Sequence, residues 1–96
     1  MTMTDQDRRI KNERIEIIAG IFAECCRYPN VHIEPIQQYW GVVFQIKYLN
    51  QHIVKSLTNE ELYIGKKICK YSDYYVIGNS IRNKLGIPPD LTLRTL

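Results

Sequence analysis

The 96-residue sequence lacks any long apolar run. A transmembrane helix needs about eighteen or more consecutive apolar residues, and Glu16 and Glu24 interrupt the most apolar part of the first expected helix. Residues 1–9 also lack the hydrophobic core of a secretory signal. These absences argue against a membrane protein, and we expect a cytoplasmic location.

Cysteine is scarce and odd in number, with three in the chain. An odd count does not make a disulfide framework, which agrees with a reducing compartment. A structural zinc site requires two pairs of ligands spaced two to four residues apart. The adjacent Cys25 and Cys26 have no second pair to complete such a site, although Cys69, His32 and His52 lie elsewhere. We therefore interpret the cysteines as buried thiols and predict no metal and no other cofactor.

Glycine-rich loops and catalytic groupings are also missing, because all five glycines are isolated. Cys69 lies between Lys67 and Lys70, whose charges could lower its pKa, but helical spacing places it toward a core. The acidic side chains lie among basic residues or at expected helix starts. The sequence predicts a non-catalytic protein without a small-molecule substrate.

What the chain does contain is an ordinary globular composition, 45% hydrophobic and 24% charged, consistent with a single domain over residues 1–96. Its longest uninterrupted segment follows Pro35. Within it, apolar positions and one asparagine recur at steps of three and four, which is typical of a packed helix. They are Ile36, Tyr39, Val43, Ile46, Asn50, Ile53 and Leu57.

A strand is the alternative for this segment, because Val42, Phe44, Ile46 and Tyr48 alternate with polar residues at Gln45 and Lys47. Gly41 would also cost a helix about 1 kcal/mol. However, a seam of this length exceeds an ordinary strand. The pattern thus favours a helix over residues 35–56.

Three further helices are expected, over residues 5–27, 59–71 and 73–85. Thr4 with Asp7 and Thr58 with Glu61 are typical helix starts, and Asp7 is also spaced to pair with Lys11 on one helix face. The last two helices could instead form one kinked helix. The prediction is a compact all-α, four-helix domain, a helical bundle that is oligomeric and has an extended tail over residues 90–96.

The leading functional hypothesis is a regulatory or adaptor protein that binds another protein, or itself as a homodimer. Phe44 and Tyr48 fall outside the apolar seam, so they are either an exposed aromatic pair or covered by another helix of the chain. Asn50 could pair across a dimer axis or bond within its own chain. The predicted partner-binding residues are Phe44, Tyr48, Trp40 and Asn50.

The alternative hypothesis is a small nucleic-acid-binding regulator. Five basic residues and a single acid, Asp73, lie between residues 62 and 87, interleaved with tyrosines. Lysine can contact phosphates, whereas Asn and Arg can read base edges. The similarity to a helix-turn-helix is poor, because no glycine occupies the turn at residues 71–73. The residues that would contact nucleic acid are Lys66, Lys67, Lys70, Asn79, Arg82, Asn83 and Lys84.

Overall fold

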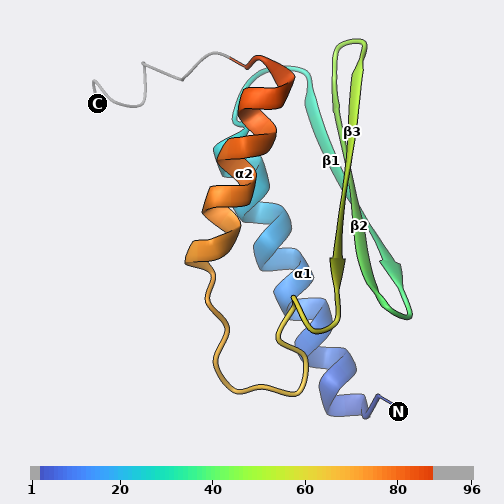
Figure 1. Ribbon diagram of the computed structural model, residues 1–96. Coiled ribbons are helices and arrows are strands. Elements are labelled where there is room, and N and C mark those ends of the chain that lie inside the picture. Colours follow the sequence, from blue (N-terminus) through green and yellow to red (C-terminus); the bar gives the residue numbers. More distant parts are fainter. Residues whose placement is uncertain (1–2, 88–96) are drawn as a thin grey trace.

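The computed structural model describes residues 3–87 and consists of a helical layer packed on one sheet (Figure 1). The elements are α1 (Asp5–Cys25), β1 (Val31–Gln38), β2 (Gly41–Tyr48), β3 (Gln51–Thr58) and α2 (Ser72–Leu85). The strands form an antiparallel sheet in the order β1-β2-β3, and both helices lie on the same side of it. The fold is α+β, so the predicted all-α four-helix bundle is wrong.

The segment predicted as a helix over residues 35–56 forms most of the sheet. Val42, Phe44 and Ile46 are each 0% exposed and face the helices, whereas the residues between them face away. The alternative strand pattern was therefore the correct one. Two tight turns, at residues 39–40 and 49–50, fold residues 31–58 into three strands of eight residues. The argument from length failed because it treated the stretch as one continuous element.

Single residues fix the details of the sheet. A Cβ atom at Gly41 would overlap the carbonyl oxygen of Leu57 on β3, so only glycine lets the two strands approach here. Leu49 opens the second turn with a positive φ of 54°. Pro35 lies on the edge strand β1, where its missing N–H removes a donor that another strand could use.

The first and last predicted helices exist. Thr4 caps α1 in a reciprocal capping box with Asp7, and the helix ends at Cys25, before Pro29. The helix α2 covers the residues predicted for 73–85 and ends at Gly86 in the left-handed conformation. The prolines after it and the predicted tail over residues 90–96 lie outside the described residues.

The predicted helix over residues 59–71 is absent, although its start is present. Thr58 and Glu61 make both bonds of a capping box, at 3.0 and 3.1 Å. Only turns follow, because Tyr63 and Gly65 have positive φ values of 58° and 83°. Left-handed residues cannot continue a right-handed helix. Residues 59–71 form an irregular connection that crosses the helical layer (Figure 1).

The core lies between the two layers. The rings of Phe22 on α1 and Phe44 on β2 meet edge to face with centroids 5.0 Å apart. Gly78 on α2 packs against Cys25, because a Cβ there would lie 2.7 Å from the cysteine sulfur. None of the helices in residues 3–87 has the length and apolar character to cross a membrane.

Candidate functional site

The predicted partner-binding residues do not form one surface. Phe44 is fully buried, and Tyr48 faces the same side of the sheet, partly buried with its ring 6.0 Å from that of Tyr28. Trp40 and Asn50 occupy the turns at opposite ends of β2. The prediction of an exposed aromatic pair is thus wrong for Phe44, and the alternative, coverage by a helix of the same chain, is correct.

The outer face of the sheet, which points away from α1 and α2, was not foreseen. Ile36 and Val43 are register partners on it, and Val54 beside them is 52% exposed. Neither helix of the described chain covers this side (Figure 1). A three-stranded antiparallel sheet with one packed and one open face is common, and the open face here carries this small apolar strip.

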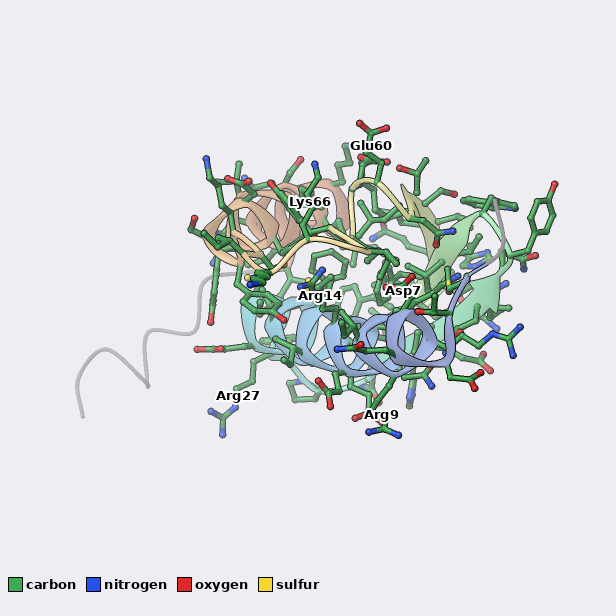
Figure 2. All side chains as sticks on the ribbon, turned by 90° about the horizontal axis from the view of Figure 1, so that it is seen from below. Asp7, Arg9, Arg14, Arg27, Glu60 and Lys66 are labelled. Atoms are coloured by element: carbon green, nitrogen blue, oxygen red, sulfur yellow. The ribbon has the colours of Figure 1, made fainter. Side chains whose placement is uncertain are left out.

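The candidate site with the most defined geometry is the segment of residues 59–71, which we call the basic loop. Arg14 of α1 is 7% exposed and reaches across to it. Its guanidinium donates to the carbonyl oxygens of Leu62 at 3.0 Å, of Lys66 at 2.7 Å, and of Tyr63. Figure 2 shows Arg14 between α1 and the loop that carries Lys66. One buried cation therefore fixes the path of the loop.

This arrangement explains why the helix predicted for the loop does not form. In a helix, the carbonyls of residues 62, 63 and 66 would accept from amides four residues later. Here the Arg14 guanidinium donates to those carbonyls, and the Tyr63 carbonyl also accepts from the amide of Lys66, only three residues later. Burying a cation is costly unless its donors are satisfied, and several main-chain carbonyl oxygens meet that need.

The basic loop presents Lys66, Lys67 and Lys70 to solvent, and all three side chains are exposed. The ammonium of Lys66 lies 5.6 Å from the centroid of the Tyr63 ring, within range of a cation–π contact. These three lysines are near neighbours in the sequence, and in the structure they lie on a connection and not on a helix.

The loop leads directly into α2. The N-cap of this helix is Tyr71, whose side chain makes no capping bond, so the start of α2 adds partial positive charge. Three acids lie near this charge. Asp73 is in the first turn and accepts from the Tyr63 hydroxyl at 3.3 Å, and the exposed Glu60 and Glu61 lie at the start of the loop.

The predicted residues on α2 do not share one face with the lysines. Asn79 and Asn83 are exposed, one turn apart. Arg82 is half-buried and lies near the two thiols of α1, where its charge opposes the rise of the Cys25 pKa. Lys84 follows two residues later, roughly 200° around the helix. The residues predicted to contact nucleic acid therefore fall into two sets, one close together on the loop and one spread around α2.

The cysteines behave as core residues. Burial raises the pKa of the Cys26 thiol to about 11, and burial also raises that of Cys25. Thiols with raised pKa values are poor nucleophiles near neutral pH. Within residues 3–87, no cluster of three or more His, Cys, Asp or Glu side chains is arranged to hold a metal ion.

Sequence reasoning missed two basic residues with defined roles, Lys11 and Arg14. Both are buried, and they continue the stripe of α1 that contains Ile15, Ile18 and Phe22. That position on an apolar stripe was the available signal. Lys11 was expected to pair with Asp7 on the surface, but its ammonium donates to the carbonyl oxygen of Gln38, 2.6 Å away.

No protein-family model, curated protein or solved structure matches this chain.

Proposed function

We propose that this protein is a small nucleic-acid-binding protein that contacts the phosphate backbone through the basic loop. The observation that carries the proposal is the attachment of this loop to Arg14. A buried guanidinium with three carbonyl acceptors holds the loop in one shape, and that loop presents three exposed lysines. Pre-positioned cations bind an anion at a lower entropic cost than mobile ones.

The arrangement favours phosphate contact over base reading. Lysine is a compact charge that suits phosphate oxygens, and the start of α2 adds partial positive charge beside the lysines. Asn79 could read a base edge, but it lies seven residues along α2, about 10 Å from the loop end of the helix. We therefore expect binding that depends weakly on nucleotide sequence.

The test is the salt dependence of binding to duplex DNA and duplex RNA, measured by fluorescence anisotropy. Three phosphate contacts predict a slope of log affinity against log salt near −2.7 for DNA, so affinity should fall roughly 40-fold between 50 and 200 mM salt. Replacing Lys66, Lys67 and Lys70 together by alanine should remove most of that slope. All three side chains are exposed, so folding should be unaffected.

A matched control separates the loop from net charge. Replacing Arg9, Arg27 and Lys47 by alanine removes the same charge from exposed positions elsewhere. Figure 2 shows Arg9 and Arg27 projecting from the side of α1 that faces away from the loop. The control variant should retain most of the affinity and slope. Equal losses of affinity in both variants would contradict the proposal. So would the absence of binding at roughly 25 mM salt, where phosphate contacts are strongest.

A second candidate function, protein binding or self-association, is favoured by the open side of the sheet. The register of the β2–β3 hairpin directs the main-chain groups of His52, Val54 and Ser56 away from β2, toward the free edge of β3. Unlike β1, this edge has no proline. A second strand could pair here. If the protein associates through the edge of β3, light scattering should show a dimer for the wild type and a monomer for Val54→Lys.

A further inference from the structure

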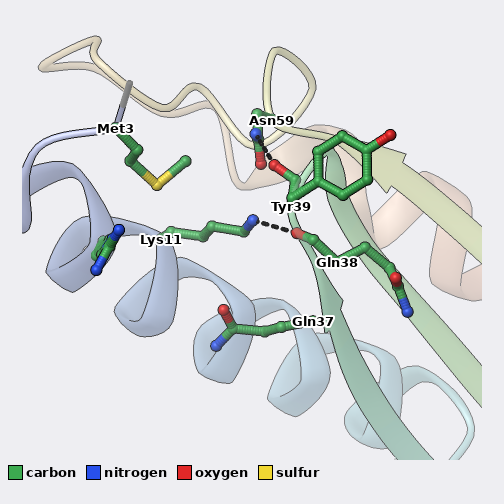
Figure 3. Close-up of a pocket in the computed structure, with 7 residues that line it drawn as sticks. Met3, Lys11, Gln37, Gln38, Tyr39 and Asn59 are labelled. Carbon is green, nitrogen blue, oxygen red and sulfur yellow. Dashed lines mark hydrogen bonds between the residues drawn. The ribbon is translucent and has the colours of Figure 1, made fainter. Parts of the chain in front are cut away.

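A separate pocket lies between the N-terminal half of α1 and the turn that joins β1 to β2 (Figure 3). Its volume is about 520 Å³, in the range of pockets that hold small molecules. Two cations and several amides line it, and no carboxylate does. The lining residues are Met3, Arg8, Lys11, Gln37, Gln38, Tyr39 and Asn59.

Lys11 gives the pocket its positive charge. This residue is 4% exposed, and burial lowers the pKa of its ammonium. An ammonium has three N–H donors, and the carbonyl oxygen of Gln38, at 2.6 Å, satisfies one of them. A buried cation with donors to spare favours an anionic acceptor. Arg8 lies one turn earlier on the same helix face and also lines the pocket.

Asn59 contributes a hydrogen-bond acceptor to the pocket, in contrast to the donors of Lys11 and Arg8. Its backbone N–H donates to the Trp40 carbonyl, and its Nδ2 donates to the Tyr39 carbonyl, both at 2.8 Å. The bond to Tyr39, drawn in Figure 3, holds the amide at the pocket wall. The Oδ1 atom is buried and has no partner in the described chain. A buried acceptor of this kind is costly unless a donor reaches it.

We propose that the pocket binds a small anionic molecule that also carries an N–H or O–H donor. Its phosphate or carboxylate group would lie at Lys11 and Arg8, and its donor would satisfy Asn59. Tyr39 also lines the pocket, and its side chain is 90% exposed. This site uses none of the lysines of the basic loop, so it stands independently of the proposed function.

Isothermal titration calorimetry with defined probes tests the site. Adenosine monophosphate and succinate represent phosphate and carboxylate, and adenosine lacks the anionic group. At least one anion should bind, identifying which group the pocket prefers, and adenosine should bind at least about tenfold more weakly than its phosphate if phosphate is preferred. Arg8→Gln and Lys11→Met should each weaken anion binding by about tenfold or more.

Controls keep the test decisive if Lys11→Met perturbs folding. Arg8 is exposed, so Arg8→Gln should fold normally, and Arg9→Gln removes an adjacent charge that does not line the pocket. The Arg9 variant should bind the anion as the wild type does. Absence of anion binding at millimolar concentration, or equal losses in the Arg8 and Arg9 variants, would overturn the proposal. Loss of binding in the triple lysine variant of the basic loop would also overturn it, because the anion would then lie on the loop.

Discussion

Replacing Arg14 by methionine tests the central claim that one buried side chain holds the basic loop. Methionine keeps an unbranched apolar stem of similar length but cannot donate to the carbonyl oxygens of Leu62, Tyr63 and Lys66. The substitution therefore removes the hydrogen bonds and leaves most of the packing. Arg14→Lys should have an intermediate effect, because a lysine ammonium can reach only some of these three carbonyl oxygens.

The expected magnitude follows from those bonds. Hydrogen bonds to a charged group contribute about 1.5–3 kcal/mol each. Adding these contributions for all the bonds would overestimate the loss of stability, because the released carbonyls can bind water and the variant no longer buries a cation. We expect Arg14→Met to lower the free energy of unfolding by about 2–4 kcal/mol, and Arg14→Lys by roughly half as much. A domain of this size can tolerate such a loss and remain folded.

Urea unfolding followed by circular dichroism measures this change, with an expected drop in midpoint of roughly 1–2 M. Arg9→Met is the matched control, because it removes the same charge from an exposed position on the same helix. The Arg14 variant should also bind duplex DNA more weakly than the Arg9 variant. A stability loss below about 1 kcal/mol with unchanged DNA binding would refute the role assigned to Arg14.

Two further predictions concern the core. Phe44→Ala should cost about 3–5 kcal/mol in urea unfolding, because the ring is fully buried against Phe22; a loss below about 1 kcal/mol would show that Phe44 is not core. The Cys26 thiol has its pKa raised from 9.0 to about 11, so its stabilising contribution is complete below pH 9 and is lost as pH rises to 11. Wild type should therefore lose about 2–3 kcal/mol more than Cys26→Ala across this window in pH-dependent unfolding, and parallel pH profiles would refute the assignment.

The sheet could have been predicted, and its evidence was in the sequence. Val42, Phe44 and Ile46 alternate with residues that face outward, and all three are fully buried. The competing helical seam arose by coincidence. Its members Ile36 and Val43 lie on the outer face, whereas Ile46 and Ile53 lie on the inner face. Apolar residues spaced three and four apart can therefore lie on either face of a sheet once turns divide the segment into strands. The two turns were not recognised, because neither contains glycine.

The turns were hard to recognise for a physical reason. Favoured two-residue hairpin turns use Asn or Gly where φ is positive. Here Leu49 takes the positive φ, and the other turn is Tyr39-Trp40. The only glycine of this region, Gly41, follows its turn and serves the approach to Leu57. Tertiary packing against α1 therefore overrides weak local turn signals.

The basic loop shows the opposite error. The local signal at Thr58 and Glu61 was correct, and both capping bonds exist. A cap satisfies the first amides of a helix, but it does not by itself continue the helix. Arg14 lies about fifty residues earlier and competes for the carbonyls that the next turn would need. No local pattern contains that competition, so only the three exposed lysines of the candidate site could be found from the sequence.

The two proposed sites share one structural cause. Lys11 and Arg14 lie one turn apart on α1 and are both buried. Lys11 donates to the carbonyl of Gln38, the last residue of β1 before the turn, and Arg14 donates to carbonyls of the basic loop. The first positions the turn that lines the pocket, and the second positions the loop that carries the lysines. Hydrophobic residues at these two positions would bury the helix at lower electrostatic cost. Buried backbone carbonyls need hydrogen-bond donors. Lys11 and Arg14 supply such donors at the end of β1 and along the basic loop, which offsets the electrostatic cost of burying two cations. The sites are nevertheless separable: Arg8→Gln should affect the pocket alone, and the triple lysine variant should affect the loop alone.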